Sequence, residues 1–322
     1  MTGTVLVTSR SFSSGDVDVA AELTGAGLTV VRGPASHDLA ELRGPLAEAV
    51  AWIAGTGRVG AEHFAAAPRL RVLARYGVGV DAVDLAAAAA GGVVVTNTPG
   101  ANTEAVADLA VALLLDVLRG VPAGDRRVRE GDWSVLRGRE LGPLTVGVIG
   151  FGRIGRAFAR RLTGFGSRVL VSDPLVPADV VRAAGAEPES PAGLAARCDA
   201  VSLHTPGGTT LIDAEWLAAA APGLVIVNTA RADLVDEPAV AAALRAGRLG
   251  GYGADTLAHE YAGDGRSPLL DPALADRVVI TPHVGAQTVE AVDRMGSLAV
   301  ADVLAVLAGR EPAHPVLQEA RT

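Results

Sequence analysis

The chain of 322 residues lacks residues that several kinds of function require. It contains no lysine, since all 28 of its basic residues are arginine, and it has a single cysteine, Cys198. Without lysine there is no Schiff-base chemistry on the protein and no Walker-type phosphate loop. A lone cysteine excludes an internal disulfide and fits a reducing compartment, where such a residue is more often buried and inert than a nucleophile.

Long apolar runs and a surplus of positive charge are also missing. No apolar stretch approaches the roughly 18 residues needed to span a bilayer, and residues 1–10 have no basic stretch followed by a long apolar core. The net charge of −8 argues against a nucleic-acid partner. We therefore expect a cytoplasmic protein that binds neither membranes nor nucleic acids. Its length exceeds what one hydrophobic core usually supports, which predicts two domains.

Short β-branched runs alternate with Ala- and Leu-rich segments of helical length. This alternation is typical of parallel sheets covered by helices on both faces, so the expected fold class is α/β with two parallel sheets. A long apolar helix is predicted over 104–119, with Thr103 as its N-cap. The expected strands are 5–8, 28–32, 50–54, 70–75 and 93–96 in one series, and 146–150, 168–172, 200–203, 224–228, 251–255 and 278–281 in another.

The second series opens on a glycine-rich turn. Gly150, Gly152 and Gly155 form the pattern G-x-G-x-x-G between an expected strand and a helix that begins at about Arg153. The first glycine permits a tight turn, the second lets the backbone approach a pyrophosphate, and the third lets the helix pack closely on the strand. The helix N-terminus adds free N–H groups that favour phosphate. The pattern therefore predicts a dinucleotide site.

Asp173 directly follows the next expected strand. A carboxylate at this position accepts hydrogen bonds from the adenosine ribose and repels a 2′-phosphate, which favours NAD over NADP. The alternative is that Asp173-Pro174 only forms a turn.

The glycine-rich turn is one of several motifs by which the sequence resembles the D-isomer-specific 2-hydroxyacid dehydrogenase family, which includes the phosphoglycerate dehydrogenases. The resemblance extends over nearly the whole chain. The motifs that carry the resemblance are 75–81, 97–103, the glycine turn, 228–231 with 235–237, Asp255 with Glu260, and 281–285. The resemblance implies a doubly wound Rossmann NAD domain (100–287) inserted in a flavodoxin-like substrate domain (1–99 with 288–322). It also implies NAD as cofactor and a homodimer. No grouping of residues has zinc-ligand spacing, and hydride transfer with a histidine as acid needs no metal, so none is expected.

The resemblance further implies hydride transfer between the nicotinamide and a small D-2-hydroxy or 2-oxo acid. The catalytic arginine of the family falls on Arg231, which would hold the acid and polarise its carbonyl. The acid/base histidine falls on His283, and Glu260 matches the acidic partner that orients the imidazole. The alternatives are a structural salt bridge for Arg231 and a solvated loop position for Glu260. His204, which also ends a strand, competes as a base, although the family uses that turn beside the cofactor.

Backbone N–H groups of Val78 and Gly79, with the Asn102 side chain, would hold the substrate carboxylate by the same resemblance. Arg75 is a candidate to pair with a distal anionic group, as in 3-phosphoglycerate or a phosphonate, or to form a surface ion pair. Asp255 would fix the nicotinamide carboxamide. The implied cofactor contacts are Thr103, Gly150, Gly152, Arg153, Ile154, Gly155, Asp173, His204, Thr205, Pro206, Thr229, Ala230, Asp255, Gly285 and Ala286.

Three positions depart from the family pattern. Ala232 replaces the usual glycine, Asp108 replaces a glutamate, and the loop after Pro206 is shorter than usual, which puts cofactor contacts beyond Pro206 in doubt. Two rival functions stay open. One is an NAD-sensing scaffold or corepressor with the same fold, and the other is an enzyme of the family that acts on a donor such as formate or phosphite.

Overall fold

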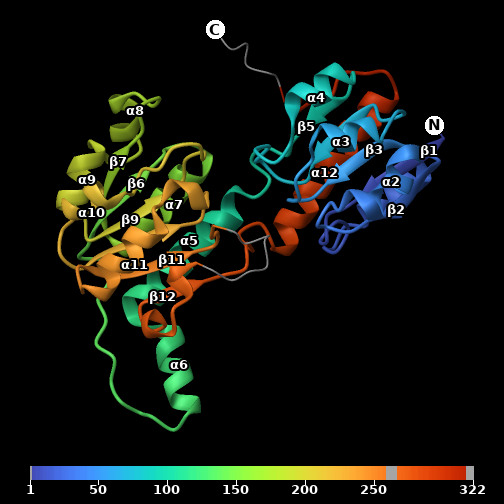
Figure 1. Ribbon diagram of the computed structural model, residues 1–322. Coiled ribbons are helices and arrows are strands. Elements are labelled where there is room, and N and C mark those ends of the chain that lie inside the picture. Colours follow the sequence, from blue (N-terminus) through green and yellow to red (C-terminus); the bar gives the residue numbers. More distant parts are fainter. Residues whose placement is uncertain (1, 259–266, 317–322) are drawn as a thin grey trace. The chain divides into compact units, whose positions relative to one another are not determined.

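The computed structural model describes residues 2–258 and 267–316, and these form two compact units (Figure 1). The first unit holds the chain up to Asn102 and again from Ala286 onward, and the second holds Thr103–Gly285. Each unit is a parallel sheet with helices on both faces, which confirms the expected α/β class with two parallel sheets.

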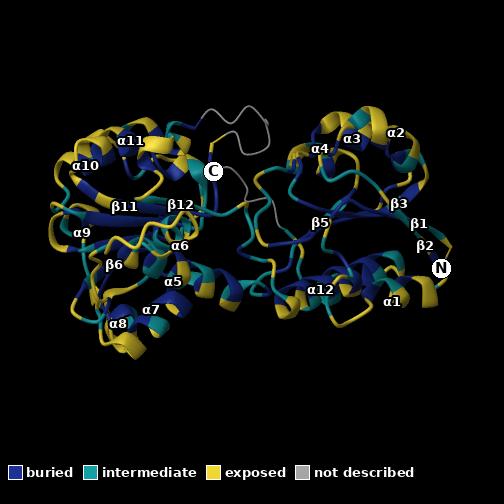
Figure 2. Ribbon diagram, turned by 90° about the horizontal axis from the view of Figure 1, so that it is seen from below, coloured by how far each residue is buried: buried dark blue, intermediate teal, exposed yellow. Residues whose placement is uncertain are grey.

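The sheet of the first unit has the strand order β2-β1-β3-β4-β5, the flavodoxin-like order of a doubly wound sheet. Its strands are β1 (Gly3–Val7), β2 (Leu28–Arg32), β3 (Ala49–Ala54), β4 (Val72–Arg75) and β5 (Val94–Thr96). Its helices are α1 (Val19–Gly25), α2 (Leu39–Glu48), α3 (Ala61–Ala65), α4 (Leu85–Ala90) and α12 (Val289–Leu307). Figure 2 shows α1 and α12 beneath the buried strands and α2, α3 and α4 above them.

Helix α12 completes the core of the first unit although it comes from the far end of the chain. Val292, Met295, Val300 and Val303 are buried in one apolar cluster with residues of β1, β3 and β4. After α12 the chain returns to the free edge of the sheet. There Pro315 forms an antiparallel bridge with Thr96, so that the tail closes the β5 edge.

The sheet of the second unit has the order β12-β11-β10-β9-β6-β7-β8, in which six strands follow the Rossmann order and β12 is added at one edge. Its strands are β6 (Thr145–Ile149), β7 (Arg168–Ser172), β8 (Glu187–Pro188), β9 (Ala200–Leu203), β10 (Leu224–Asn228), β11 (Leu249–Ala254) and β12 (Val278–Ile280). Its α-helices are α5 (Thr103–Arg119), α6 (Val121–Arg129), α7 (Arg153–Phe165), α8 (Ala178–Ala183), α9 (Pro191–Arg197), α10 (Ala214–Ala218) and α11 (Glu237–Arg245).

Three local differences separate the structure from the sequence-based expectation. Helix α5 begins at Thr103, one residue before the expected start at 104. The two-residue edge strand β8 was not predicted, because it contains Pro188, which suits only a sheet edge. Helix α6 was not predicted either, because it contains Pro122, Gly124 and three arginines and buries only Ala123.

The described part of the chain was expected to lack membrane-spanning helices and metal sites and to hold an inert cysteine. No helix in residues 2–258 and 267–316 is long and apolar enough to cross a membrane. Within the same ranges, no group of three or more His, Cys, Asp or Glu residues has the arrangement of a metal site. Cys198 is buried, and burial raises its pKa to about 12, so the thiol is protonated and unreactive at neutral pH.

Candidate active site

The predicted site residues of the second unit follow the carboxyl ends of its parallel strands. Gly150 follows β6, Asp173 follows β7, His204 follows β9, Thr229 follows β10, and Asp255 follows β11. Because all these strands run in parallel, these residues lie along one edge of the sheet, where open α/β sheets bind their ligands. Arg75, Val78, Gly79, Asn102 and Ala286 belong to the first unit.

The glycine turn has the geometry that its pattern predicts. Gly150 has a φ of +91°, and a Cβ atom there would lie 2.6 Å from the His204 carbonyl oxygen. A Cβ on Gly155 would lie 2.0 Å from the Gly150 carbonyl oxygen, so only glycine lets α7 approach the strand this closely. At Gly152, the N-cap of α7, no described atom lies within 4 Å of a Cβ position. The start of α7 therefore offers open space and free N–H groups, which fits a phosphate.

The Asp173 carboxylate shapes the turn beside the glycines. One oxygen accepts a hydrogen bond from the backbone N–H of Phe151 at 2.6 Å, and the other accepts from Leu175 at 2.8 Å. Asp173 therefore does form a turn, as the alternative interpretation expects. The turn holds the carboxylate directly after β7, the position at which the glycine-turn pattern expects a ribose contact.

Buried polar atoms along the same edge have no hydrogen-bond partner within the described residues. These atoms are Thr229 Oγ1, Thr256 Oγ1 and His204 Nδ1. Buried polar groups in proteins are almost always hydrogen-bonded, so this cluster of orphaned atoms fits a site that receives a polar ligand. The residues at the edge are thus compatible with a bound dinucleotide.

His204 cannot serve as the proton donor. Its Nε2 lies 2.9 Å from the Ser202 hydroxyl, and its ring packs on Phe158 with 4.9 Å between centroids. Burial lowers the pKa of His204 to about 3, so the imidazole is neutral at physiological pH. This environment disfavours His204 as a proton donor, whereas its role as a base stays a prediction.

Asp255 organises the loop that carries His283. Its carboxylate is 2% exposed and accepts hydrogen bonds from the Thr281 hydroxyl at 2.5 Å, the Val284 N–H at 2.8 Å and the Gly285 N–H at 2.7 Å. These donors flank His283 on both sides. His283 itself has a φ of +54°, a left-handed conformation that costs free energy for a non-glycine residue and marks a constrained position. One buried carboxylate therefore sets the path of the histidine loop.

Asn228 does the same for Arg231. Its side-chain oxygen accepts from the Ala230 N–H at 3.0 Å, and its Nδ2 donates to the Arg231 carbonyl at 2.8 Å. Both contacts close the turn that leads from β10 to the guanidinium. The sequence motif contains Asn228, but the motif alone gave no role for it. An asparagine at the end of a buried strand is a known former of such turns, and this is the signal that could have assigned its role.

Glu260 lies outside the described residues. Glu237, a buried residue of α11, binds the described residues on both sides of that segment. Its carboxylate accepts from the Ala258 N–H at 2.6 Å and from the Ser267 hydroxyl at 2.6 Å.

The short loop after Pro206 is fixed by the segment that follows Arg231. The Gly208 N–H donates to the Asp233 carboxylate at 2.6 Å, and the Thr210 hydroxyl donates to the Asp233 carbonyl at 3.0 Å. A Cβ at Gly207 would lie 2.6 Å from the same carboxylate, so a larger residue there would displace the Asp233 side chain.

In the first unit, the loop after β4 holds the residues predicted to bind the substrate carboxylate. Arg75 is 9% exposed and donates to the Tyr76 carbonyl, so it is buried, and its alternative role in an ion pair stays a prediction. Its guanidinium lies beside Gly77, where a Cβ would be 2.8 Å from Nη1. Asn102 Oδ1 is buried without a hydrogen-bond partner in the part of the chain that the structure describes, as expected of a ligand-facing group.

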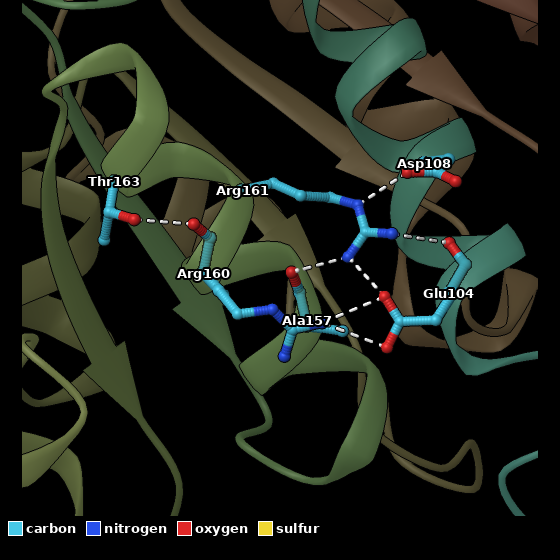
Figure 3. Close-up of polar contacts among 6 residues, drawn as sticks. All are labelled: Glu104, Asp108, Ala157, Arg160, Arg161 and Thr163. Atoms are coloured by element: carbon cyan, nitrogen blue, oxygen red, sulfur yellow. Dashed lines mark hydrogen bonds and ion pairs between the residues drawn. The ribbon is translucent and has the colours of Figure 1, made fainter.

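An ion-pair network joins the start of α5 to the glycine-turn helix α7 (Figure 3). Arg161 lies 2.8 Å from Glu104 and 2.6 Å from Asp108, and Arg160 lies 2.9 Å from Glu104. Hydrogen bonding from Arg161, more than any other interaction, lowers the pKa of Glu104. The substitution of Asp108 for the usual glutamate is accommodated here, because the shorter carboxylate still reaches Arg161.

Comparison with known protein families identifies the second unit. Residues 111–285 match the family model described as "D-isomer specific 2-hydroxyacid dehydrogenase, NAD binding domain". The match covers the glycine turn, Asp173, Arg231, Asp255 and His283.

Curated relatives cover both units. A D-3-phosphoglycerate dehydrogenase of Mycobacterium tuberculosis is 45% identical over 256 residues, which are 78% of this chain and 48% of that protein. The chain thus spans about half the length of this relative. A glyoxylate reductase of Korarchaeum cryptofilum is 38% identical over 274 residues, 82% of this chain and 81% of that protein.

Solved structures share the fold. D-lactate dehydrogenase of Aquifex aeolicus, solved with NAD and lactic acid, superposes with a TM-score of 0.84 at 26% identity, covering 98% of this chain and all of that one.

Proposed function

Because the chain belongs to the D-isomer-specific 2-hydroxyacid dehydrogenase family, we propose that it catalyses NAD-dependent hydride transfer between a small D-2-hydroxy acid and its 2-oxo counterpart. The observation that carries the proposal is that Arg231, His283 and the glycine turn all come after the carboxyl ends of parallel strands in one sheet. Arg231 and His283 each lie in a turn fastened by a buried polar residue, Asn228 or Asp255. Such support is what a catalytic group needs to keep its geometry.

The residues of the second unit would hold NAD along the edge of the sheet. The N-terminus of α7, with Thr103, Arg153 and Ile154, would bind the pyrophosphate, and Asp173 the ribose. Thr205 and Pro206 would flank the cofactor, and Thr229, Ala230 and Gly285 would surround the nicotinamide, as would Ala286, the residue that directly follows this unit in the chain. A carboxylate offers about four acceptor sites, and Asp255 uses three of them with described residues, so a further site would serve the carboxamide.

When bound, NAD accepts or supplies the hydride at its nicotinamide ring. In the reductive direction, the Arg231 guanidinium binds the carboxylate and carbonyl oxygen of the 2-oxo acid and stabilises the charge that develops on that oxygen. The His283 imidazolium then gives its proton to the oxygen, and in the oxidative direction the neutral imidazole removes it. Glu260 would accept a hydrogen bond from the imidazole and orient it.

For the substrate we propose an acid with a distal anionic group, as in 3-phosphoglycerate or a phosphonate, as the first candidate. Similarity to the mycobacterial phosphoglycerate dehydrogenase and to a glyoxylate reductase supports the 2-oxo acid class. Arg75 supports the distal group, because its guanidinium lies beside the carboxylate loop and would attract a second negative charge.

The test is oxidation of NADH with a panel of acids that includes glyoxylate, pyruvate, hydroxypyruvate, phosphohydroxypyruvate and branched 2-oxo acids, with formate and phosphite assayed in the oxidative direction. We expect turnover of at least one 2-oxo acid and a loss of about a hundredfold or more in kcat for His283→Ala, as general acid catalysis requires. The NADH dissociation constant of the variant, measured by fluorescence, is the control and should stay close to that of the wild type.

Tight NADH binding without turnover of any acid would instead favour the sensing scaffold. Turnover that survives His283→Ala unchanged would contradict the assigned roles.

We also propose a homodimer formed through residues 120–140 of the NAD-binding unit, called here the arm. The arm contains α6 and the segment after it, which project from the sheet in Figure 1. Trp133 and Val135 on the arm are 79% and 92% exposed, and Val121 and Val128 are also exposed. Apolar side chains gathered on a projecting segment are typical of a surface that is covered by a partner.

A further inference from the structure

The two peptide groups proposed to bind the substrate carboxylate are both held by residues that directly follow β5. The carbonyl of Gly77 accepts a hydrogen bond from the Thr98 N–H at 3.0 Å. The carbonyl of Val78 accepts a hydrogen bond from the Asn97 side-chain Nδ2 at 2.7 Å. Both acceptors, and both donors, belong to the first unit.

Each of these carbonyls shares a peptide plane with one of the proposed carboxylate donors. The Gly77 carbonyl and the Val78 N–H belong to one peptide group, and the Val78 carbonyl and the Gly79 N–H belong to the next. In a planar trans peptide the N–H points away from the C=O, so fixing the carbonyl fixes the direction of the N–H. Thr98 and Asn97 thereby aim the Val78 and Gly79 N–H groups away from the end of β5.

The two fastenings differ in kind. The bond to Gly77 uses a backbone N–H that any residue except proline supplies, whereas the bond to Val78 depends on the Asn97 amide. Each of the two peptides has a glycine on one side, Gly77 or Gly79, and glycine tolerates a wide range of backbone angles, so both peptides need a hydrogen bond to hold their orientation. Among the described residues, the Asn97 side chain is the group that a substitution can remove from the Val78 carbonyl, and with it the orientation of the Gly79 N–H.

Asn97 is itself braced by the C-terminal segment. Its backbone N–H donates to the His314 carbonyl at 3.3 Å. Two residues further along, the Val316 N–H donates to the Val95 carbonyl at 2.8 Å. Asp302 of α12, 1% exposed, anchors the segment by accepting from the Ala313 N–H at 2.7 Å and by pairing with His314 at 3.1 Å. The amide of Asn97 is thus carried on a fixed backbone.

We propose that Asn97 is a positioning residue that orients the Gly79 N–H toward the substrate carboxylate, and so sets substrate affinity without touching the substrate. The inference rests on the proposed function, since the carboxylate is that of the 2-oxo acid. A hydrogen bond to the Val78 carbonyl also polarises the peptide, which makes the Gly79 N–H a stronger donor to an anion.

The test compares Asn97→Asp and Asn97→Ala with the wild type. Aspartate keeps the shape of asparagine but replaces the donor with a carboxylate that repels the Val78 carbonyl, whereas alanine only removes the donor. We expect KM for the preferred 2-oxo acid and the inhibition constant of oxalate to rise about tenfold in Asn97→Ala and further in Asn97→Asp. The carboxylate is bound equally before and during the reaction, so kcat should change less than twofold.

The NADH dissociation constant and the melting temperature separate positioning from folding. Both should stay near the wild-type values in Asn97→Ala, as in the control Glu311→Gln, which alters an exposed residue of the C-terminal segment. Unchanged KM and oxalate inhibition in Asn97→Asp overturn the proposal. A joint loss of kcat, NADH affinity and melting temperature in both variants assigns Asn97 a purely structural role and overturns it as well.

Failure of the proposed function is a distinct result. If the wild type turns over no 2-oxo acid, the melting temperature with oxalate and NADH still decides the inference. Oxalate that stabilises the wild type but not Asn97→Asp upholds the orientation of the loop, whereas oxalate that stabilises neither protein overturns it.

Discussion

Asp255 and Asn228 show how single buried side chains prepare the catalytic loops. Each lies at the end of a central strand and makes two or more hydrogen bonds to the turn that follows it or its neighbour. The backbone N–H of Asp255 in turn donates to the Asn228 carbonyl at 3.0 Å. The turns carrying Arg231 and His283 are therefore coupled through adjacent strands of one sheet.

Replacing Asp255 by alanine should affect both stability and turnover. The change leaves Thr281, Val284 and Gly285 with donors that lack their acceptor, and buried unsatisfied donors cost about 1–3 kcal/mol each. We expect a loss of about 2 kcal/mol or more in the free energy of unfolding by urea, and a drop in kcat of at least tenfold at saturating substrate. Asp179→Ala, at an exposed site on α8, is the matched control. Wild-type kcat in Asp255→Ala would show that the histidine loop holds its shape without this carboxylate.

The elements around the glycine turn are joined by the Glu104–Arg161 network (Figure 3). Arg161 is mostly covered, whereas Glu104 and Asp108 are half exposed or more, so solvent screens the pairs and each contributes little alone. The network links the first turn of α5 to the last turns of α7. It thereby connects the residue after Thr103 with the helix proposed to bind the pyrophosphate.

The contribution of this network should depend on pH with a defined sign. The folded protein holds the pKa of Glu104 below its ordinary value of 4.5, mainly through hydrogen bonding from Arg161. The stabilisation is therefore complete above about pH 4.5 and is lost as the pH falls through the lower, folded-state pKa. We expect Glu104→Gln to unfold more easily than the wild type at pH 7, by a few tenths to about 1 kcal/mol. The two proteins should converge on acidification, as followed by urea unfolding across the pH range. A difference that grows toward low pH would contradict this assignment.

Sequence patterns predicted most of the elements because buried parallel strands are compositionally distinct. The runs 28–32, 168–172, 200–203 and 224–228 coincide with observed strands, since β-branched residues fill both faces. Helix α6 escaped prediction because it projects from the sheet and buries little, so no apolar periodicity marks it. The family and the parallel α/β architecture are confirmed, and so is NAD as the cofactor of this domain type.

The site could be predicted as residue types but not as contacts. Motif positions pointed to Arg231, His283 and Asp255, whereas the hydrogen bonds that fasten their loops join residues far apart in the chain. The bond from Gly285 to Asp255 and the bond from Asn97 to Val78 are examples. Such partners depend on strand order, which a local pattern does not contain.

At the scale of the whole molecule, the exposed arm predicts self-association. Arg126 and Arg127 both pair with Asp276, the residue that precedes β12 by two positions, so the base of the arm is fixed to the second unit while its apolar tip stays uncovered. We expect the wild type to sediment as a dimer and the double substitution Trp133→Ser with Val135→Ser to weaken the dimer at least tenfold. Light scattering over a concentration series would measure the shift, with Leu175→Ser, an exposed apolar position on the loop before α8, as control. A wild type that stays monomeric at high concentration would contradict the proposal.

The chain passes from the first unit into the second after Asn102 and back after Gly285. During synthesis on the ribosome, the first five strands therefore emerge long before α12, whose Val292, Met295 and Val300 fill one face of their sheet. The inserted unit is contiguous and can fold as soon as it leaves the exit tunnel. The N-terminal sheet meanwhile lacks the helix that covers one of its apolar faces, so the unit that begins first in the sequence is the last to complete its core.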